Sequence, residues 1–219
     1  MTYAMCESQC DTPESRDINN KAFWDKLGEI FKVTMEMVTE KAVEMGIDLN
    51  AIDHEKFEKQ ENHVHEIVES RPYTQAAKAY IKMVNDWFES NRELLKDKGD
   101  ELQSQADAQI PGTKPADDAA SIKDCLEVIG WYQPQIYVKL CRAASGMIRG
   151  ELEDDIEYFP EDAKGSAGVA VLGIERSIAA WGRLLGQFPD QERSILDLLV
   201  HLKSLLQQVK AEFPKTTLR

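Results

Sequence analysis

Four side chains that bind metal ions well recur at helical spacing within residues 53–69. They are His54, Glu58, Glu61 and His65, separated by four, three and four residues. Because an α-helix has about 3.6 residues per turn, this spacing places all four on one stripe of a helix. Imidazole and carboxylate groups are suitable ligands for zinc, iron or manganese. One interpretation is therefore a divalent metal ion as cofactor, in a metal-binding or metal-dependent helical enzyme.

The same stripe has a second interpretation, in which the four side chains lie on a solvated face and contact one another at i,i+4. One straight helix rarely surrounds a metal ion, because residues two turns apart are about 10 Å distant. A second helix would have to supply ligands, and no Glu-x-x-His pair occurs elsewhere in the sequence. We favour the solvated face and keep metal binding as the alternative.

A second group of charged side chains lies on the polar sides of two later helices. Glu127, Lys139 and Arg142 are interleaved with apolar residues of one helix, and Arg176 lies on the next. Arginine beside exposed aromatic side chains is suited to binding an anionic ligand or a protein partner. Ion pairing with the abundant surface carboxylates is the simpler interpretation. The sequence leaves both open.

Small residues are concentrated in the segment 165–186, which holds five of the twelve glycines in the chain. Each glycine costs a helix about 1 kcal/mol relative to alanine. Tolerating this cost suggests that another backbone or a ligand approaches the helix closely. We therefore expect a homodimer in which this small-residue helix forms the contact.

Charge and hydropathy exclude several classes of function. Lysine and arginine total 26 against 39 acidic residues, which gives a formal charge of −13. Nucleic acids and anionic membranes both bind through clustered cations, so neither is an expected partner. No apolar stretch approaches the roughly 20 residues that span a bilayer, and no signal-peptide pattern opens the chain. We expect an acidic cytoplasmic protein, and no arrangement of serine, cysteine and histidine predicts nucleophilic catalysis.

The cysteines predict no disulfide within the helical part of the chain. Cys125 and Cys141 fall on one predicted helix, about 24 Å apart by its rise, too far for a bridge. Cys6 and Cys10 lie in the polar N-terminal segment without a second pair at zinc-finger spacing. We expect reduced thiols, with a metal clip or mixed disulfide in that segment as the alternative.

Apolar residues at three- and four-residue steps predict the elements that position these groups. The first predicted helix has the stripe Phe23, Leu27, Ile30, Phe31, Thr34, Val38 and Met45. No segment alternates as a half-buried strand does. Asn91 falls within the third apolar stripe, and Pro134 lies inside the fourth helix, where it predicts a kink. The six predicted helices are 19–45, 53–69, 74–98, 118–148, 160–185 and 191–213.

The predicted fold is therefore all-α, a bundle of about six amphipathic helices. Residues 1–16 are expected to be a disordered tail, and residues 17–219 a single domain. A Pro-Gly loop at 108–117 marks the place where that domain would divide. The most economical function is a non-catalytic interaction or regulatory protein. The metal-binding enzyme and the binder of small anionic ligands are the alternatives.

Overall fold

A computed structural model describes residues 20–46, 54–152 and 158–214 of the chain. Over these residues the chain forms α-helices, one short 3-10 helix and no strand, which confirms the all-α prediction. No helix among them has the length and apolar character needed to cross a membrane. The elements are α1 (Lys21–Glu44), α2 (His54–Ser70), α3 (Pro72–Ser90), α4 (Arg92–Asp107), α5 (Pro115–Leu152), α6 (Tyr158–Gln187), η4 (Pro189–Gln191) and α7 (Glu192–Glu212).

The chain divides into two compact units, Met1–Glu58 and Lys59–Arg219. The described part of the first unit is α1 with the beginning of α2, and the second unit holds the other helices. The single domain predicted from the sequence, with a division at 108–117, stays a prediction. The loop between α4 and α5 lies within the second unit. The predicted tail at 1–16 lies outside the described residues.

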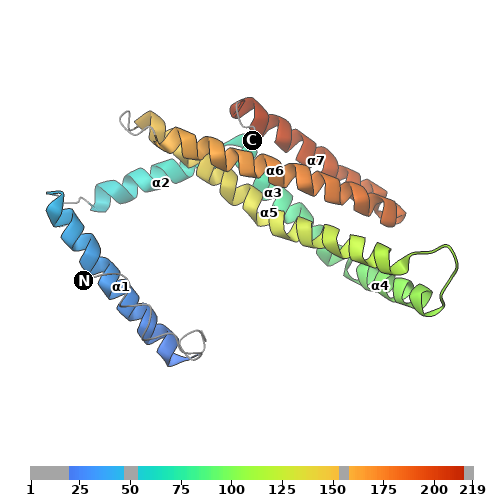
Figure 1. The fold of residues 1–219 in the computed structure, drawn as a ribbon. Coiled ribbons are helices and arrows are strands. Elements are labelled where there is room, and N and C mark those ends of the chain that lie inside the picture. The colour runs from blue at the N-terminus through green and yellow to red at the C-terminus, as the bar shows by residue number, and fades with distance from the viewer. Residues whose placement is uncertain (1–19, 47–53, 153–157, 215–219) are drawn as a thin grey trace. The chain divides into compact units, whose positions relative to one another are not determined.

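A long antiparallel hairpin of α5 and α6 is the centre of the second unit (Figure 1). Its register is fixed by side-chain contacts, because Arg142 bonds Asp162 near one end and Arg176 bonds Tyr132 further along. The buried face of α6 repeats at four- and three-residue steps, which is the pattern of helices packed along a shallow crossing angle. That face consists of Ala163, Ala167, Ala170, Ile174, Ser177, Trp181 and Leu184.

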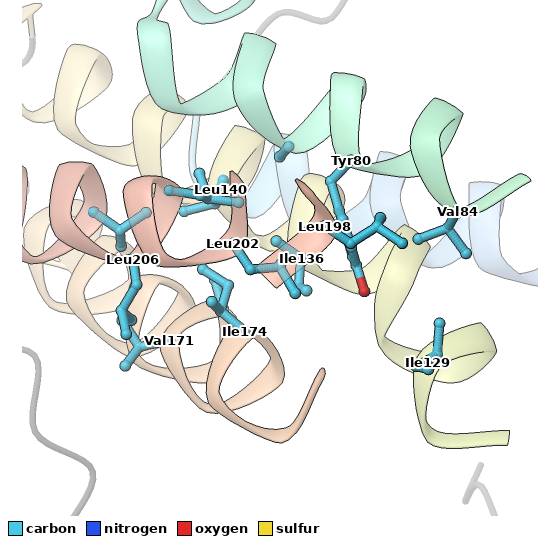
Figure 2. Packing of buried hydrophobic residues seen from close by; sticks show 14 of the residues in the cluster. Tyr80, Val84, Ile129, Ile136, Leu140, Val171, Ile174, Leu198, Leu202 and Leu206 are labelled. Carbon is cyan, nitrogen blue, oxygen red and sulfur yellow. The ribbon is translucent and has the colours of Figure 1, made fainter. Parts of the chain in front are cut away.

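The hairpin is covered by α3 and α7, and α4 packs along α5. On α7 the apolar residues recur once per turn, so that one side of the helix is buried and the other is polar. Figure 2 shows the resulting cluster, to which α3, α5, α6 and α7 all contribute side chains. Fully or almost fully buried members include Tyr80, Val84, Ile129, Ile136, Leu140, Ile174, Leu198 and Leu202.

Two buried tryptophans each donate a hydrogen bond from the indole N–H to another side chain. The indole N–H of Trp181 donates to the Tyr80 hydroxyl at 3.1 Å, and that of Trp87 donates to Ser194 Oγ at 3.2 Å. The two indole rings meet edge to face, with centroids 4.9 Å apart. Burying an indole without a partner for its N–H would be costly, so these bonds allow both rings to pack fully.

The segment predicted as one helix over 74–98 is two helices, α3 and α4, separated at Asn91. Asn91 leaves the helical backbone conformation, with φ −111° and ψ 17°. Its buried side-chain amide donates to the Trp87 carbonyl at 2.8 Å, and the Asn91 backbone N–H donates to the same carbonyl at 3.0 Å. Asn91 thus lies within the apolar stripe, as the sequence placed it, at the position where α3 ends. By contrast, α5 continues through Pro134, and the expected kink there stays a prediction.

Candidate functional site

The predicted metal stripe lies on α2, and one of its members has another partner. Glu61 accepts two hydrogen bonds from Arg149 Nη2 of α5, at 2.5 and 2.6 Å. Glu58 and His65 are exposed, and the side chain of His54 lies outside the described residues. Among the described residues, no three or more His, Cys, Asp and Glu side chains come close enough to hold a metal ion. The metal site on this stripe stays a prediction, and Glu61 forms an ion pair with Arg149.

The charged residues of the predicted anion site are also paired, and in two separate places. Arg142 donates to both oxygens of Asp162, at 2.8 and 2.7 Å. The hydrogen bonds from this guanidinium lower the pKa of Asp162, and the nearby Lys139 acts in the same direction. The structure thus brings Lys139 and Arg142 together around one carboxylate, that of Asp162.

Arg176 belongs to a different level of the hairpin. It donates to the Tyr132 hydroxyl at 3.0 Å, and its guanidinium carbon lies 5.8 Å from the centre of that ring. Tyr132 precedes Arg142 by ten residues, which corresponds to about 15 Å along α5. Glu127 is exposed and lies 3.8 Å from Lys123 of its own helix. The structure therefore places the four predicted residues at different levels of the hairpin, and the anion site stays a prediction.

The small residues of α6 are largely buried within the chain itself. Gly173 is the clearest case, because a Cβ atom placed there would lie 2.9 Å from Tyr132 Cδ1 and 3.1 Å from Ile136 Cγ1. Gly168 is also buried, whereas Gly165 and Gly182 are exposed, and a Cβ atom added at either would have no neighbour within 4 Å. The expected close approach is thus made by α5 of the same chain at Gly173. A homodimer through this helix stays a prediction.

A polar network that the sequence did not reveal joins α2, α3 and α5. The Glu69 carboxylate accepts hydrogen bonds from Lys78 Nζ, at 2.7 Å, and from the Tyr137 hydroxyl. These bonds, that from Lys78 first, lower the pKa of Glu69. The bond to Glu69 raises the pKa of Tyr137, and burial raises that of the neighbouring Cys141. All these effects favour the charge states of a closed structural network rather than a nucleophile or base prepared for reaction.

The described residues contain one hollow worth noting, at the loop between α4 and α5. It has a volume of about 440 Å³ and is lined by residues such as Gln105, Gln109, Thr113 and Asp117. Gln109 and Asp117 are exposed, and the hollow is open to solvent. It holds none of the predicted site residues.

The most distinctive surface of the described residues lies on α1. Large apolar side chains of α1 and its C-cap are between 47% and 73% exposed, and they are Trp24, Ile30, Phe31, Val33, Met35, Met37, Val38, Val43 and Met45. The whole described part of the second unit has five such residues, which are Ile110, Trp131, Val138, Leu196 and Val200. Contiguous exposed apolar surface is uncommon on soluble proteins and marks sites of contact.

The arrangement of α1 explains how this surface arises. At 100° per residue, most of its apolar side chains fall within an arc of about 160°, and nearly all charged ones lie on the other side. We call this arc the α1 face, formed by Phe23, Trp24, Leu27, Ile30, Phe31, Thr34, Met35, Met37, Val38, Ala42 and Met45. The predicted stripe held seven of these positions. The apolar residues beside that stripe, such as Trp24 and Met35, were the signal in the sequence that the apolar face of α1 is broad.

Comparison with known proteins gives no family for this chain. No family model matches it, and no curated protein and no solved structure is significantly similar to it. Function is therefore inferred from side-chain chemistry alone.

Proposed function

We propose that this protein is a non-catalytic interaction protein, in which α1 is the element that binds a partner helix. The α1 face, on which Ile30, Phe31 and Met35 are each more than half exposed, carries this proposal. A helix with a broad apolar face buries it against other helices, in the manner of amphipathic helices that lie in apolar grooves or bundles. Three of the seven methionines of the chain, Met35, Met37 and Met45, belong to this face. Methionine is flexible and polarisable, which suits it to binding surfaces.

The second unit supports the proposal in the role of a scaffold. Two of its candidate ligand-binding side chains form ion pairs with other helices, Glu61 with Arg149 and Arg142 with Asp162. Such pairs hold helices in position, whereas a reaction requires groups that converge on a substrate. A unit of helices held by such pairs and, in the same chain, an exposed apolar helix are together expected of an interaction protein.

Site-specific photo-crosslinking tests this function in the cell. A photoreactive amino acid replaces Phe31, which lies on the α1 face, and in a matched protein it replaces Val33, which lies on the polar side of the helix. We expect crosslinks from position 31 to a second polypeptide chain, and few or none from position 33. Crosslinks from position 31 that reach only residues 59–214 of the same chain would show an intramolecular role for α1. That result would overturn the proposal.

A further inference from the structure

The order of residues along the α1 face is symmetric about the middle of the helix. The central seam of this face comprises positions 24, 27, 31, 34, 35, 38, 42 and 45, which recur at the spacing of a two-helix contact. Reversing the helix about the midpoint between Thr34 and Met35 reproduces the same set of positions. The reversal exchanges Trp24 with Met45, Leu27 with Ala42 and Phe31 with Val38.

A second α1 running in the opposite direction would therefore meet apolar side chains at every level of the seam. It would also meet a smaller residue opposite each larger one, because Phe31 faces valine and Leu27 faces alanine. Alternation of large and small residues lets facing helices interdigitate. The Thr34 hydroxyl, which lies in the seam, already donates to the Ile30 carbonyl at 2.8 Å. Burial of this hydroxyl would therefore not leave it without an acceptor.

Charge along α1 favours the same arrangement. The first half, residues 21–32, has three lysines and two carboxylates, for a net charge of +1. The second half, residues 33–44, has one lysine and three glutamates, for a net charge of −2. Antiparallel helices place the halves of opposite sign together, whereas a parallel pair in register places like charges together. The helix dipoles are also opposed in the antiparallel pair.

Self-association of a chain with a formal charge of −13 is opposed by its overall charge. The segment 21–44 holds four lysines and five carboxylates and is close to neutral, so two copies meet there with little local repulsion. A helix of 24 residues is about 36 Å long, enough for three heptads of contact. Within the first unit, the only other described element is the beginning of α2, which is too short to cover the α1 face.

We infer that the partner of α1 is the α1 of a second copy, in an antiparallel pair whose two-fold axis passes between Thr34 and Met35. A two-fold axis perpendicular to a helix makes the contact isologous, so that each copy offers the same surface to the other. This inference deepens the proposed function by naming its partner, and it rests on that function.

Two valines of α1 provide a matched test. Val38 lies in the seam and Val33 on the other side of the helix, and both are 47% exposed. Light scattering over a range of concentrations should give twice 24.8 kDa for the full-length wild type. Val38→Glu should weaken the association by roughly a hundredfold, since the carboxylate enters the contact twice. Val33→Glu, which has the same effect on helix propensity, should leave the dissociation constant within about threefold of the wild-type value.

Disulfide crosslinking tests the direction of the helices. In a chain whose four cysteines are replaced by alanine, proteins carrying Phe31→Cys and Val38→Cys are mixed under mild oxidation. The antiparallel pair joins position 31 to position 38 and gives the mixed dimer. A parallel pair joins each position to itself and gives only the two homodimers, and that outcome would overturn the inference.

The outcomes separate this inference from the proposed function. A wild type of 24.8 kDa at all concentrations, or equal effects of Val38→Glu and Val33→Glu, overturns the self-association. If photo-crosslinks from position 31 then reach a different protein, the proposed function stands without it. If they reach residues 59–214 of the same chain, both fail.

Discussion

Two helices of similar length, α1 and α7, show how the same kind of pattern leads to different surroundings. Both are amphipathic, with apolar residues at three- and four-residue steps. On α7 these residues are buried, and Ile195, Leu202 and Leu205 have no exposed surface. On α1 the only buried residue is Ala42, while Phe31 is 63% exposed. The apolar pattern predicts which face of a helix will be buried. It does not predict whether the residues that bury this face belong to the same chain.

The two apolar faces should contribute to different free energies, that of α7 to folding and that of α1 to association. Apolar surface that is buried within the chain stabilises the fold by about 25 cal/mol per Å². Apolar surface that stays exposed contributes nothing to the stability of the monomer, and its energy is available for association. Substitutions on α7 should therefore change unfolding, and substitutions on α1 should change binding.

The largest expected effect is the loss of a core side chain on α7. Leu202→Ala should lower the free energy of unfolding by about 2–5 kcal/mol, because Leu202 is fully buried and its truncation leaves a cavity. Phe31→Ala removes a larger side chain from α1. It should change the same quantity by no more than about 0.5 kcal/mol at protein concentrations where the chain is monomeric.

Urea denaturation followed by tryptophan fluorescence measures this difference, since Trp87 and Trp181 are buried in the second unit. Equal destabilisation by Phe31→Ala and Leu202→Ala would show that α1 is part of the same cooperative core. The proposed difference between α1 and α7 would then be wrong.

Alanine substitutions at two glycines of α6 should change the stability of the fold by smaller amounts, and in opposite directions. Gly173→Ala should destabilise the fold by about 1–2 kcal/mol, because the new methyl group meets Tyr132 and Ile136 in a packed contact. Gly182→Ala, at an exposed position with nothing within 4 Å of the added carbon, should stabilise it by up to about 1 kcal/mol. Thermal unfolding of both variants checks the prediction. Stabilisation by both would mean that α5 and α6 do not meet closely at Gly173.

The regular helices were predictable from the sequence because their apolar residues follow one period. Helix α7 was predicted over 191–213 and spans Glu192–Glu212. The division at Asn91 was not predicted, because the apolar stripe passes through it without a change of period. The 3-10 turn Pro189–Gln191 was missed for a related reason, since three residues are too short to show any period.

The candidate sites were less predictable, because each depends on residues far apart in the sequence. The partner of Glu61 is Arg149, which is separated from it by 88 residues. Spacing along α2 placed Glu61 correctly on a stripe with His65, and gave no information about the helix facing that stripe. Likewise, the apolar residues of α1 were visible in the sequence, but whether the chain covers them is a tertiary property.

The contact between Glu61 and Arg149 offers a third measurement, of how firmly residues 59–70 are held by α5. Arg149→Met should cost about 1 kcal/mol, because the pair is bidentate but only partly buried. A double-mutant cycle with Glu61→Gln should give a coupling energy of similar size. Additive effects of the two substitutions would show that the ion pair contributes nothing to the fold.

The smallest expected effect is a pH dependence of stability that arises from Glu69, near the C-terminal end of α2. Hydrogen bonds from Lys78 and Tyr137 lower the pKa of Glu69 below its ordinary value of 4.5. Its ionised form is thus favoured by folding, and the stability that it contributes is present above pH 4.5. That stability is lost as the pH falls through the lowered pKa of the folded state.

The stability difference between the wild type and Glu69→Gln should therefore be greatest near neutral pH and shrink as acid protonates Glu69. Urea denaturation at a series of pH values measures it. In a Lys78→Met background the difference should be smaller at neutral pH, because the main cause of the lowered pKa is gone. A difference that stays constant down to about pH 3, or that ignores Lys78, would mean that Glu69 acts through packing and not through its charge. No comparable dependence should arise from the α1 face, which owes its behaviour to uncharged side chains.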